Sequence, residues 1–458
     1  MKSVISSRKT FAQRLCAAFL AADWTPEGLF DASIALLGHR REATQRDLAA
    51  EVFEASGTVY APAPRRLTVI LRQARSFEEL FSACNDKIAK APPLPMPARM
   101  TPLATFAELP LPQLATAGDL ARWLDLSPRR LDWFADIAGR NTEAQTEALN
   151  HYCWHWLPRR NGLPRLIEAP KPTLKRLQRR ILREILDLVP CHPAAEGFRK
   201  GRSCHNHAQR HAGEDLVIAA DLRDFFLRVP LARVHGLFRS LGYPWDVARL
   251  LTGICSSNLP QDAFDDLAKA QLPTWRNRGR QLAPHLPQGA PTSPSLANLC
   301  CWRLDLRLAG LARSFDANYS RYADDLAFSG GADLTQAVAP YLRCLAKIVR
   351  EEGHGLNHAK TRVMGRGGRQ RLTGLVVNDH INLPRETFDG LKATLFNCAR
   401  FGPESQNREN HPAFRAQLDG RVTWVESVNP GRGAKLRRLF ERIEWGSGQD
   451  RSGAAQFL

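Results

Sequence analysis

Several features are scarce in this 458-residue sequence, and each scarcity excludes a class of protein. No apolar run approaches the length of a membrane span, so no membrane partner is expected. The basic N-terminus carries a short apolar stretch that resembles a weak signal peptide. Arg14 interrupts this stretch, however, and no small-residue cleavage site precedes Trp24. We therefore expect an amphipathic helix there and a cytoplasmic protein.

Cysteine pairs with metal-binding spacing are also missing. The sequence has 10 cysteines, none of which forms a C-x-x-C pair. Cys300 and Cys301 are adjacent, an arrangement that suits neither a zinc site nor an easily formed disulfide. Reduced thiols in a cytosolic protein are the simplest interpretation.

Acidic residues are few compared with basic ones. The chain has 64 Lys and Arg against 46 Asp and Glu, a formal net charge of +18. Residues 151–213 alone hold 13 Lys and Arg against 4 Asp and Glu. A solvated surface without a partner is one interpretation, but the excess lies just ahead of the acidic motifs described below. This placement favours a polyanionic partner such as nucleic acid.

Two helical regions flank a proline-rich segment. Residues 1–88 predict a separate helical module, whose role the sequence does not reveal. Residues 89–116 contain the run KAPPLPMPARMTPLATFAELPLP, and its prolines exclude a single helix or a central strand. We interpret this segment as a linker. A helical pattern resumes from Ala117 through Gly139.

Residues 162–188 predict a hairpin followed by a basic helix. Gly162-Leu-Pro supplies the hairpin turn, and alternating residues follow to Pro170. Thr173 is a candidate cap for the helix. Apolar residues recur at helical spacing and basic residues occupy other faces. The apolar residues are Leu174, Leu177, Ile181, Ile185 and Leu188, and the basic ones are Lys175, Arg176, Arg179, Arg180 and Arg183.

Further along, the pattern alternates between strands and helices. The predicted elements are a buried strand that runs into a turn or helix (216–229), a helix from Ser293, a hairpin with Ala323, Asp324 and Asp325 at its tip (318–330), a helix (333–352), a hairpin that turns at Asn378-Asp379 (372–384) and a mostly helical end (385–445).

Carboxylates at strand ends suggest phosphoryl transfer. This chemistry needs positioning and charge neutralisation, which two magnesium ions held by carboxylates provide. Asp221 follows the apolar run Leu216–Ala220, and Asp324-Asp325 lies between two β-rich pieces. An isolated Asp-Asp is more often a polar turn, so the pair gains meaning only from the motifs around it.

The Tyr322-Ala-Asp-Asp325 segment resembles the YxDD box of reverse transcriptases, and other motifs of that family occur in the family's order. They are Asp221-Leu-Arg-Asp-Phe-Phe226, Leu286-Pro-Gln-Gly-Ala-Pro-Thr-Ser-Pro294, Leu356-Asn-His-Ala-Lys-Thr361 and Leu372-Thr-Gly374. The resemblance covers roughly residues 117–445. It implies an α+β right-hand polymerase behind the N-terminal helical module. The implied parts are a helical entry and fingers (117–215), a palm (216–384) and an RNA-binding thumb (385–458).

Within that family the chain most resembles the bacterial retron enzymes. The resemblance rests on residues 162–188, on GFRKGRSCHNHAQRH (197–211) and on the Leu372-Thr-Gly element. The long N-terminal extension also resembles that of the larger myxobacterial retron enzymes. Two positions depart from the retron pattern. His207 stands where the Asn of Asn-Ala-x-x-His is expected, with Asn206 one place early, and Leu372 replaces Val.

The resemblance implies a specific reaction and specific partners. A retron reverse transcriptase copies part of a structured non-coding RNA into single-stranded DNA from dNTP substrates. A guanosine 2′-OH in the RNA is the primer, so the product is a branched RNA-linked DNA (msDNA). Two Mg²⁺ ions are the expected cofactors. Retron systems typically include an effector protein and serve in phage defence.

The family also implies roles for individual residues. Asp221 and Asp324 are expected to bind both metal ions, with Asp325 as a supporting carboxylate. Clustered carboxylates repel one another without a bound cation, which supports this assignment. Phe226, five places after Asp221, corresponds to an aromatic steric gate against the ribose 2′-OH. An ordinary buried Phe is the alternative, and Phe225 fits the core better.

Other candidates contact the nucleotide. Gln288 and Gly289 lie in a loop that could touch the incoming nucleotide and template, although a structural turn is the alternative. Arg165 and Lys171 are candidates for the triphosphate, and solvated surface is the alternative. Lys360 could neutralise or protonate the leaving pyrophosphate.

Candidates for RNA contact come from two regions. Asn206 and His211 could bind RNA, although such residues are more often structural. Trp424 suits a C-terminal thumb that holds RNA by stacking, with basic residues for the phosphates and apolar residues for the core. The basic residues are Lys435, Arg437, Arg438 and Arg442, and the apolar ones are Leu436, Leu439 and Phe440.

Two alternatives remain open. The chain could be another prokaryotic reverse transcriptase, from a group II intron or an abortive-infection system. No maturase or zinc-dependent endonuclease segment is recognisable, which favours the retron interpretation. A catalytically idle RNA-binding scaffold is the second alternative, and the intact aspartate triad argues against it.

Overall fold

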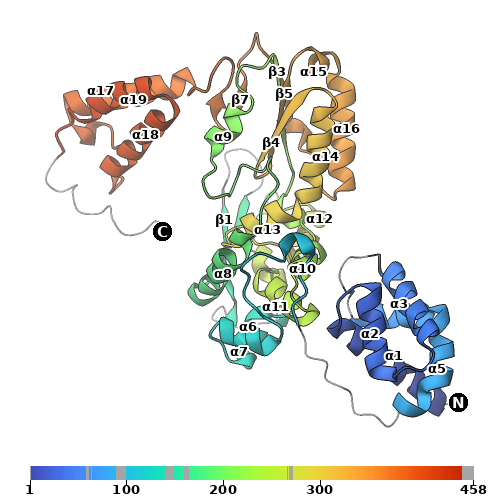
Figure 1. The fold of residues 1–458 in the computed structure, drawn as a ribbon. Coiled ribbons are helices and arrows are strands. Elements are labelled where there is room, and N and C mark those ends of the chain that lie inside the picture. The colour runs from blue at the N-terminus through green and yellow to red at the C-terminus, as the bar shows by residue number, and fades with distance from the viewer. Residues whose placement is uncertain are drawn as a thin grey trace. The chain divides into compact units, whose positions relative to one another are not determined.

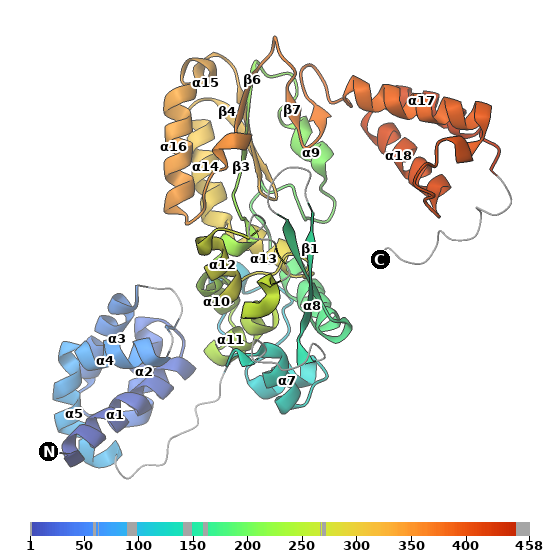
Figure 2. The ribbon, with the colours of Figure 1, turned by 180° about the vertical axis from the view of Figure 1, so that it is seen from behind.

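The protein is described by a computed structural model that covers residues 2–57, 61–62, 64–88, 99–140, 149–158, 164–265, 267 and 272–445 (Figures 1 and 2). The chain divides into two compact units. The first unit is formed by Met1–Cys191 and Asp224–Cys300, and the second by His192–Arg223 and Cys301–Leu458.

The first unit begins with a helical bundle, drawn in blue in Figure 1, which confirms the predicted helical character of this region. Phe11 lies at the centre of its core, with ring centroids 5.5 Å from both Phe77 and Phe81. Thr25 caps the second helix by accepting a hydrogen bond from the Gly28 N–H at 3.0 Å. The helices are α1 (Lys2–Ala21), α2 (Pro26–Leu37), α3 (Glu42–Ser56), α4 (Pro64–Gln73) and α5 (Arg75–Ile88).

After the predicted linker, of which residues 89–98 lie outside the described part, the helical pattern from Ala117 forms two short helices. These are α6 (Ala117–Trp123) and α7 (Pro128–Ala135). Thr116 and Asp119 form a capping box at the start of α6, and Ser127 caps α7, which has a proline at its first position. The prediction of helix from 117 is therefore confirmed, with a break that the second cap enforces.

The hairpin predicted at 162–170 is confirmed in part, because only its second strand lies in that range and the first strand precedes it. Strands β1 (Tyr152–Leu157) and β2 (Arg165–Pro170) pair antiparallel, and residues 162 and 163 of the predicted turn lie outside the described residues. Helix α8 (Pro172–Glu184) buries Leu174, Leu177 and Ile181 of the predicted apolar stripe, whereas Ile185 and Leu188 lie beyond the end of the helix. The predicted cap at Thr173 is wrong. The helix starts two residues earlier than this cap implies, with Lys171 at the N-cap, because the fixed φ of Pro172 suits the first helical position.

The rest of the first unit is helical and includes the helix predicted from Ser293. Its helices are α10 (Leu231–Ser240), α11 (Trp245–Ile254), α12 (Trp275–Leu282) and α13 (Ser293–Cys300).

The second unit is built on an antiparallel sheet in the strand order β4-β5-β3-β6. Its strands are β3 (Leu216–Asp221), β4 (Ala317–Tyr322), β5 (Asp325–Gly330) and β6 (Arg362–Gly365). The predicted strand from 216 and the predicted hairpin at 318–330 are both confirmed. The central strand β3 is mostly buried, as its apolar composition requires.

Helices cover one face of this sheet (Figure 2). They are α14 (Trp302–Arg313), α15 (Ala332–Gln336) and α16 (Val338–Glu351), the last two forming the helix predicted at 333–352. Phe328 of β5 stacks on Tyr319 of β4 at 4.9 Å and meets Tyr341 of α16 edge-on at 5.4 Å. Val217 and Ala327 belong to a separate core with the C-terminal helices.

The hairpin predicted at 372–384 contains two reversals. Strands β7 (Arg371–Leu372) and β8 (Leu375–Val376) pair across a tight turn at Thr373-Gly374, where both residues have positive φ. Val376 and Asn382 then exchange backbone hydrogen bonds of 2.8 and 2.9 Å. The predicted reversal around Asn378-Asp379 is confirmed, and a tighter turn precedes it.

The C-terminal region is helical as predicted. Its helices are α17 (Arg385–Phe401), α18 (Phe414–Val428) and α19 (Pro430–Phe440). A further helix of the second unit, α9 (Cys204–Gln209), precedes β3 in the chain. Leu436 and Phe440 are buried in the core, as expected, and Leu439 packs against it. No helix in the described part of the chain combines the length and apolar character of a membrane span. Residues 446–458 of the predicted thumb lie outside the description.

Candidate active site

The sheet of the second unit brings the predicted catalytic carboxylates together. Strand β3 ends at Asp221 and β5 begins at Asp325, and the two residues are direct partners in the antiparallel register. Directly opposed residues project from the same face of a sheet. Asp324 lies in the turn between β4 and β5, where its carbonyl oxygen accepts a 2.8 Å hydrogen bond from the Leu222 N–H. The three carboxylates therefore share one edge of the sheet.

A buried ion pair fixes the turn that carries these residues. Ala323 has φ of +59°, a left-handed conformation that is uncommon for a residue with a side chain. Its carbonyl oxygen accepts a 3.1 Å hydrogen bond from Arg321 Nη1. The same guanidinium binds Asp305 of α14 through two bonds of 2.8 and 2.7 Å, and both side chains are fully buried. The turn is thus tied to a rigid helix.

Local charges shape the electrostatics of the carboxylates. Lys360 Nζ lies 3.0 Å from Asp221 Oδ2, although the lysine side chain is 60% exposed. Partial desolvation, followed by repulsion from Asp324 and Asp221, raises the pKa of Asp325 to about 6, while Lys360 acts in the opposite direction. The edge of the sheet therefore holds an excess of negative charge that a cation relieves.

A pocket of about 360 Å³ opens beside these carboxylates. It is lined by Asp221, Asp325, Lys360, His207 and the Thr373-Gly374 turn, together with neighbouring strand residues. Acidic and basic groups thus face the same space. The predicted lysine and the predicted LTG element both border this pocket, as the family motifs imply.

The donor set fits magnesium in the form that phosphoryl-transfer sites use. Magnesium is commonly held by one or two carboxylates, with substrate phosphates and water completing its coordination. Among the described residues, no three Asp, Glu, His or Cys side chains converge into a complete metal cage. Asp221, Asp324 and Asp325 would supply carboxylate oxygens, and Lys360 already places a positive charge against Asp221. The residues therefore fit a magnesium site whose coordination substrate phosphates and water would complete.

Behind the pocket, a buried polar network joins α9 to the sheet. His211 Nδ1 lies 2.8 Å from Ser329 Oγ and its Nε2 lies 2.8 Å from Ser320 Oγ, which also bonds to His207 Nδ1 at 2.7 Å. Both histidines are fully buried. The prediction that His211 contacts RNA is therefore wrong, because each of its ring nitrogens is satisfied inside the protein.

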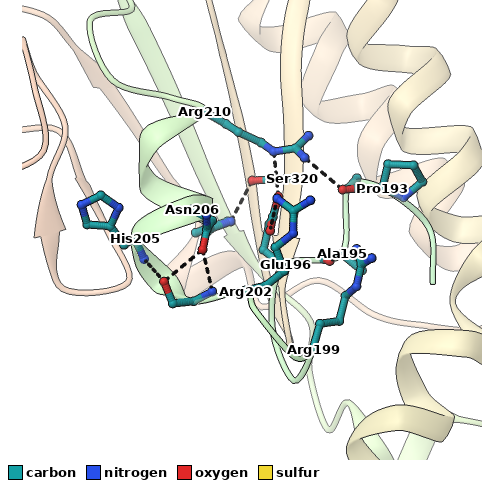
Figure 3. A network of polar contacts seen from close by, with 12 residues as sticks. Pro193, Ala195, Glu196, Arg199, Arg202, His205, Asn206, Arg210 and Ser320 are labelled. Atoms are coloured by element: carbon teal, nitrogen blue, oxygen red, sulfur yellow. Dashed lines mark hydrogen bonds and ion pairs between the residues drawn. The ribbon is translucent and has the colours of Figure 1, made fainter. Parts of the chain in front are cut away.

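Asn206 has a structural use as well. Its Oδ1 accepts hydrogen bonds from the N–H and the Oγ of Ser203 at 2.9 and 3.1 Å, which completes a capping box at the start of α9 (Figure 3). An RNA contact by Asn206 remains a prediction.

The predicted nucleotide-binding residues Gln288 and Gly289 lie in the first unit. The Gln288 carbonyl accepts a 2.8 Å bond from the Glu168 N–H of β2. Gly289 has φ of +136°, and a Cβ there would lie 2.7 Å from the Glu168 carbonyl oxygen, so only glycine fits. A buried pair of His285 Nε2 and Glu168 Oε2 at 2.8 Å fixes the same contact. The loop is therefore held rigidly on the hairpin.

The remaining candidates of the first unit are more open. Arg165 is exposed on β2, and Lys171 is half-buried at the N-cap of α8. Phe226 is half-buried with its ring centroid 5.3 Å from that of Phe225, which is buried as expected.

The thumb candidates divide into two groups. Trp424 is 38% exposed, and Lys435 and Arg438 are exposed on α19, so these side chains can reach a ligand. Arg437 instead binds Glu426 at 2.8 Å and Asp419, which locks α19 against α18. Its charge is already neutralised inside the thumb, so the prediction that it binds RNA phosphate is not supported by its contacts.

Two functional features escaped the sequence analysis. The Arg321–Asp305 pair has no sequence signal, because the partners lie on different elements. Phe198 is an exposed aromatic with φ of +58° beside Tyr322. The flanking glycines of Gly197-Phe-Arg-Lys-Gly201 could have indicated an unusual loop there.

Comparison with known proteins agrees with this site. Residues 157–383 match the family described as reverse transcriptase (RNA-dependent DNA polymerase). The chain is 39% identical over 335 residues to the retron Mx65 reverse transcriptase of Myxococcus xanthus, with 73% of each chain covered. It is 36% identical to the retron Mx162 reverse transcriptase of the same organism, covering 72% of this chain and 68% of that one. The retron Ec86 reverse transcriptase of Escherichia coli is 35% identical, with 50% of this chain and 64% of that one covered.

The matched region contains all the carboxylates at the sheet edge, the lysine that faces them and the Gln288-Gly289 loop. The matches to the two Myxococcus enzymes cover more than two thirds of this chain and of each enzyme. The chain therefore belongs to the retron reverse transcriptases and is an RNA-directed DNA polymerase.

Proposed function

We propose that this reverse transcriptase copies part of a structured non-coding RNA into a branched, RNA-linked single-stranded DNA. A guanosine 2′-OH in that RNA serves as the primer. The observation that carries the proposal is the direct opposition of Asp221 and Asp325, with Asp324 in the adjoining turn, in a chain 39% identical to a retron enzyme.

We assign metal binding to these carboxylates. Asp221 and Asp324 would hold two Mg²⁺ ions, and Asp325 would support them. When bound, the ions activate the attacking oxygen and stabilise the leaving pyrophosphate. The raised pKa of Asp325 supports the assignment, because a group crowded by like charges gains most from a neighbouring cation.

Lys360 is proposed to act on the leaving group. Its Nζ contacts Asp221 Oδ2 at 3.0 Å while most of its side chain remains accessible, so the ammonium can turn toward a triphosphate without crossing buried structure. There it would neutralise or protonate the pyrophosphate. Arg165 and Lys171 are proposed to bind the triphosphate, Phe226 to exclude the ribose 2′-OH, and Gln288 and Gly289 to position the nucleotide.

The RNA partner is proposed to contact the thumb. Trp424 offers an exposed ring for stacking, and Lys435 and Arg438 offer charges for phosphates. Arg437 would hold these helices in place instead of binding RNA. The family further suggests an effector protein and a role in antiphage defence.

The decisive experiment is expression of the gene with its native flanking DNA, followed by a denaturing gel of RNase-treated nucleic acid. We expect a small, discrete DNA species whose mobility changes after treatment with debranching enzyme. Asp324→Asn should abolish it, whereas the matched control Asp333→Asn, an exposed carboxylate on α15, should not.

Other outcomes would separate the alternatives. Activity on an added primer–template without a branched product would keep the polymerase and refute the retron product. Retention of biological function by Asp324→Asn would instead favour the idle RNA-binding scaffold.

A further inference from the structure

Residues 197–202, here called the Phe198 loop, lie directly against the catalytic turn. The Glu196 N–H that precedes the loop donates a 2.7 Å hydrogen bond to the Arg321 carbonyl oxygen of β4. A Cβ at Gly197 would lie 2.6 Å from the Ala323 backbone nitrogen, so the loop backbone touches the turn and only glycine fits. The position of this loop is therefore set by the same turn that carries Asp324.

Phe198 is held in an unfavourable state in two respects. Its φ of +58° is left-handed, which is strained for a bulky residue. Its side chain is 48% exposed, so a large apolar ring faces water beside Tyr322, with the ring centroids 6.5 Å apart. Glycine or asparagine would fit this backbone better, and a polar residue would suit the exposure.

A network of buried and half-exposed charges maintains this state (Figure 3). The Glu196 carboxylate is fully buried and lies 2.8 Å from Arg210 Nε and 3.5 Å from Arg202 Nη1. Arg199 Nη1 donates to the Ala195 carbonyl at 2.8 Å. The figure shows these arginines gathered around Glu196, with the capping residue Asn206 at the far end of the loop. Both ends of the loop are therefore fixed by hydrogen bonds and ion pairs.

The position of the loop identifies what the ring can meet. The end of the primer has to reach the carboxylates, so the RNA–DNA base pairs next to it lie near the β4–β5 turn that carries Asp324. The loop adds positive charge at this point, since Lys200 and Arg202 are exposed. Paired bases in a duplex cover one another's faces, so the ring cannot stack between them. A wide, shallow minor groove instead exposes sugars that an aromatic ring can cover.

We propose that Phe198 is a binding residue for the nascent RNA–DNA duplex. Its ring packs on the sugars of the minor groove next to the primer end, and Lys200 lies on the side of the phosphates. This inference rests on the proposed function, because it assumes that the primer end lies at Asp221, Asp324 and Asp325. The strained backbone holds the ring in place before the duplex arrives, so binding requires no further ordering of the loop.

The test measures duplex affinity and protein stability together. The probe is a short, fluorescein-labelled RNA–DNA hybrid with a recessed DNA 3′ end, titrated with full-length protein without nucleotide, and read by anisotropy. Phe198→Gly should weaken binding by about 10-fold, as expected for loss of one partly buried aromatic contact. Its thermal midpoint should equal or exceed that of the wild type, because glycine relieves the strain.

Two further variants complete the design. Phe198→Asn keeps a residue that tolerates left-handed φ but lacks the ring, and it should weaken binding as Phe198→Gly does. Leu306→Ala removes an equally exposed apolar side chain from α14 in the same unit, and it should bind like the wild type.

The outcomes are distinct. Unchanged affinity in Phe198→Gly and Phe198→Asn, or a lowered thermal midpoint that accounts for the loss, would overturn the inference. So would equal weakening by Leu306→Ala. The readout is binding and does not depend on catalysis. If the wild-type protein makes no branched DNA in cells but the Phe198 variants still bind the hybrid more weakly than it does, only the proposed function is refuted.

Discussion

The ion pair between Arg321 and Asp305 offers a test that separates stability from function. Both side chains are fully buried, and they are joined by hydrogen bonds of 2.8 and 2.7 Å. Tyr319 adds a 2.8 Å hydrogen bond to Asp305 Oδ1. Nη1 of Arg321 also reaches the catalytic turn, where it donates to the Ala323 carbonyl. The bonds between Arg321 and Asp305 therefore stabilise the fold, and the bond from Arg321 to Ala323 positions the turn. Different variants remove these two kinds of contact.

The expected magnitudes follow from burial. Asp305→Asn leaves the guanidinium charge without its counter-charge in the interior, which typically costs about 3–5 kcal/mol. Replacement of both partners, Asp305→Leu with Arg321→Met, removes both buried charges, which is often neutral or stabilising. The Tyr319 hydroxyl then loses its bond to Asp305, at a cost of about 1–3 kcal/mol. The double variant still lacks the bond to the Ala323 carbonyl. Because a misplacement of about 1 Å at a reacting group can cost 100-fold in rate, we expect synthesis to fall about 10- to 100-fold.

Hydrogen exchange of peptides from β4 and β5 is the suitable stability assay, because a chain with two compact units need not unfold in a single transition. Asp305→Asn should speed exchange in this hairpin, and the double variant should restore protection. Single-turnover extension of a primer–template then reports function. A matched control is Arg385→Met with Asp389→Leu, an exposed pair on α17 that should change neither readout.

Two results would refute this reasoning. If hydrogen exchange in the β4–β5 hairpin of Asp305→Asn is as slow as in the wild type, the charges are not buried as described. Full activity of the double variant would mean that the bond from Arg321 to the Ala323 carbonyl does not position the turn.

Two further predictions concern charge near the pocket. Lys360→Met should slow single-turnover nucleotide addition by about 10²-fold, the usual contribution of a proton-transfer group. The variant should lose less with a nucleotide analogue whose leaving group is more acidic than pyrophosphate, because that group needs less protonation. Burial, together with Arg210, lowers the pKa of His207 to about 4. As the pH falls, His207 is therefore protonated in the unfolded chain before it is protonated in the folded one. The stability of the fold keeps its full value above pH 6.5 and falls by on the order of 3 kcal/mol toward pH 4. Hydrogen exchange of peptides from α9 and β4, measured at both ends of this range, should show the loss, and His207→Asn should reduce it.

Local sequence patterns predicted elements well where neighbours along the chain decide them. The β4–β5 hairpin and the apolar stripe of α8 depend on alternation and helical spacing, and both are present. Thr173 failed as a cap because Pro172 has the stronger preference for the first helical position. The tight turn at Thr373-Gly374 was missed because positive φ at a threonine has no common signal.

The site was predicted to the extent that family motifs carried it. Asp221, Asp324 and Asp325 gather at one sheet edge because strand order and register, not spacing, bring them together. His211 was assigned to RNA because its motif resembles a retron element. Its environment, however, consists of Ser320 and Ser329, which lie more than 100 residues away in the chain. Such tertiary partners leave no local trace.

The motif around His207 and His211 can now be understood as a brace for the catalytic hairpin. A neutral histidine can donate from one ring nitrogen and accept at the other, so His211 can bridge Ser320 of β4 and Ser329 of β5 at once. Its pKa is held well below the ordinary value by burial, so it stays neutral, as this bridge requires. Arg321, the next residue of β4 after Ser320, binds Asp305 of α14 and the Ala323 carbonyl. Together these contacts fix β4 and β5 on both sides of the Asp324 turn. The proposed binding of metal ions by carboxylates from different strands would gain from such rigidity, because reorganisation of the turn would otherwise add to the barrier of every nucleotide addition.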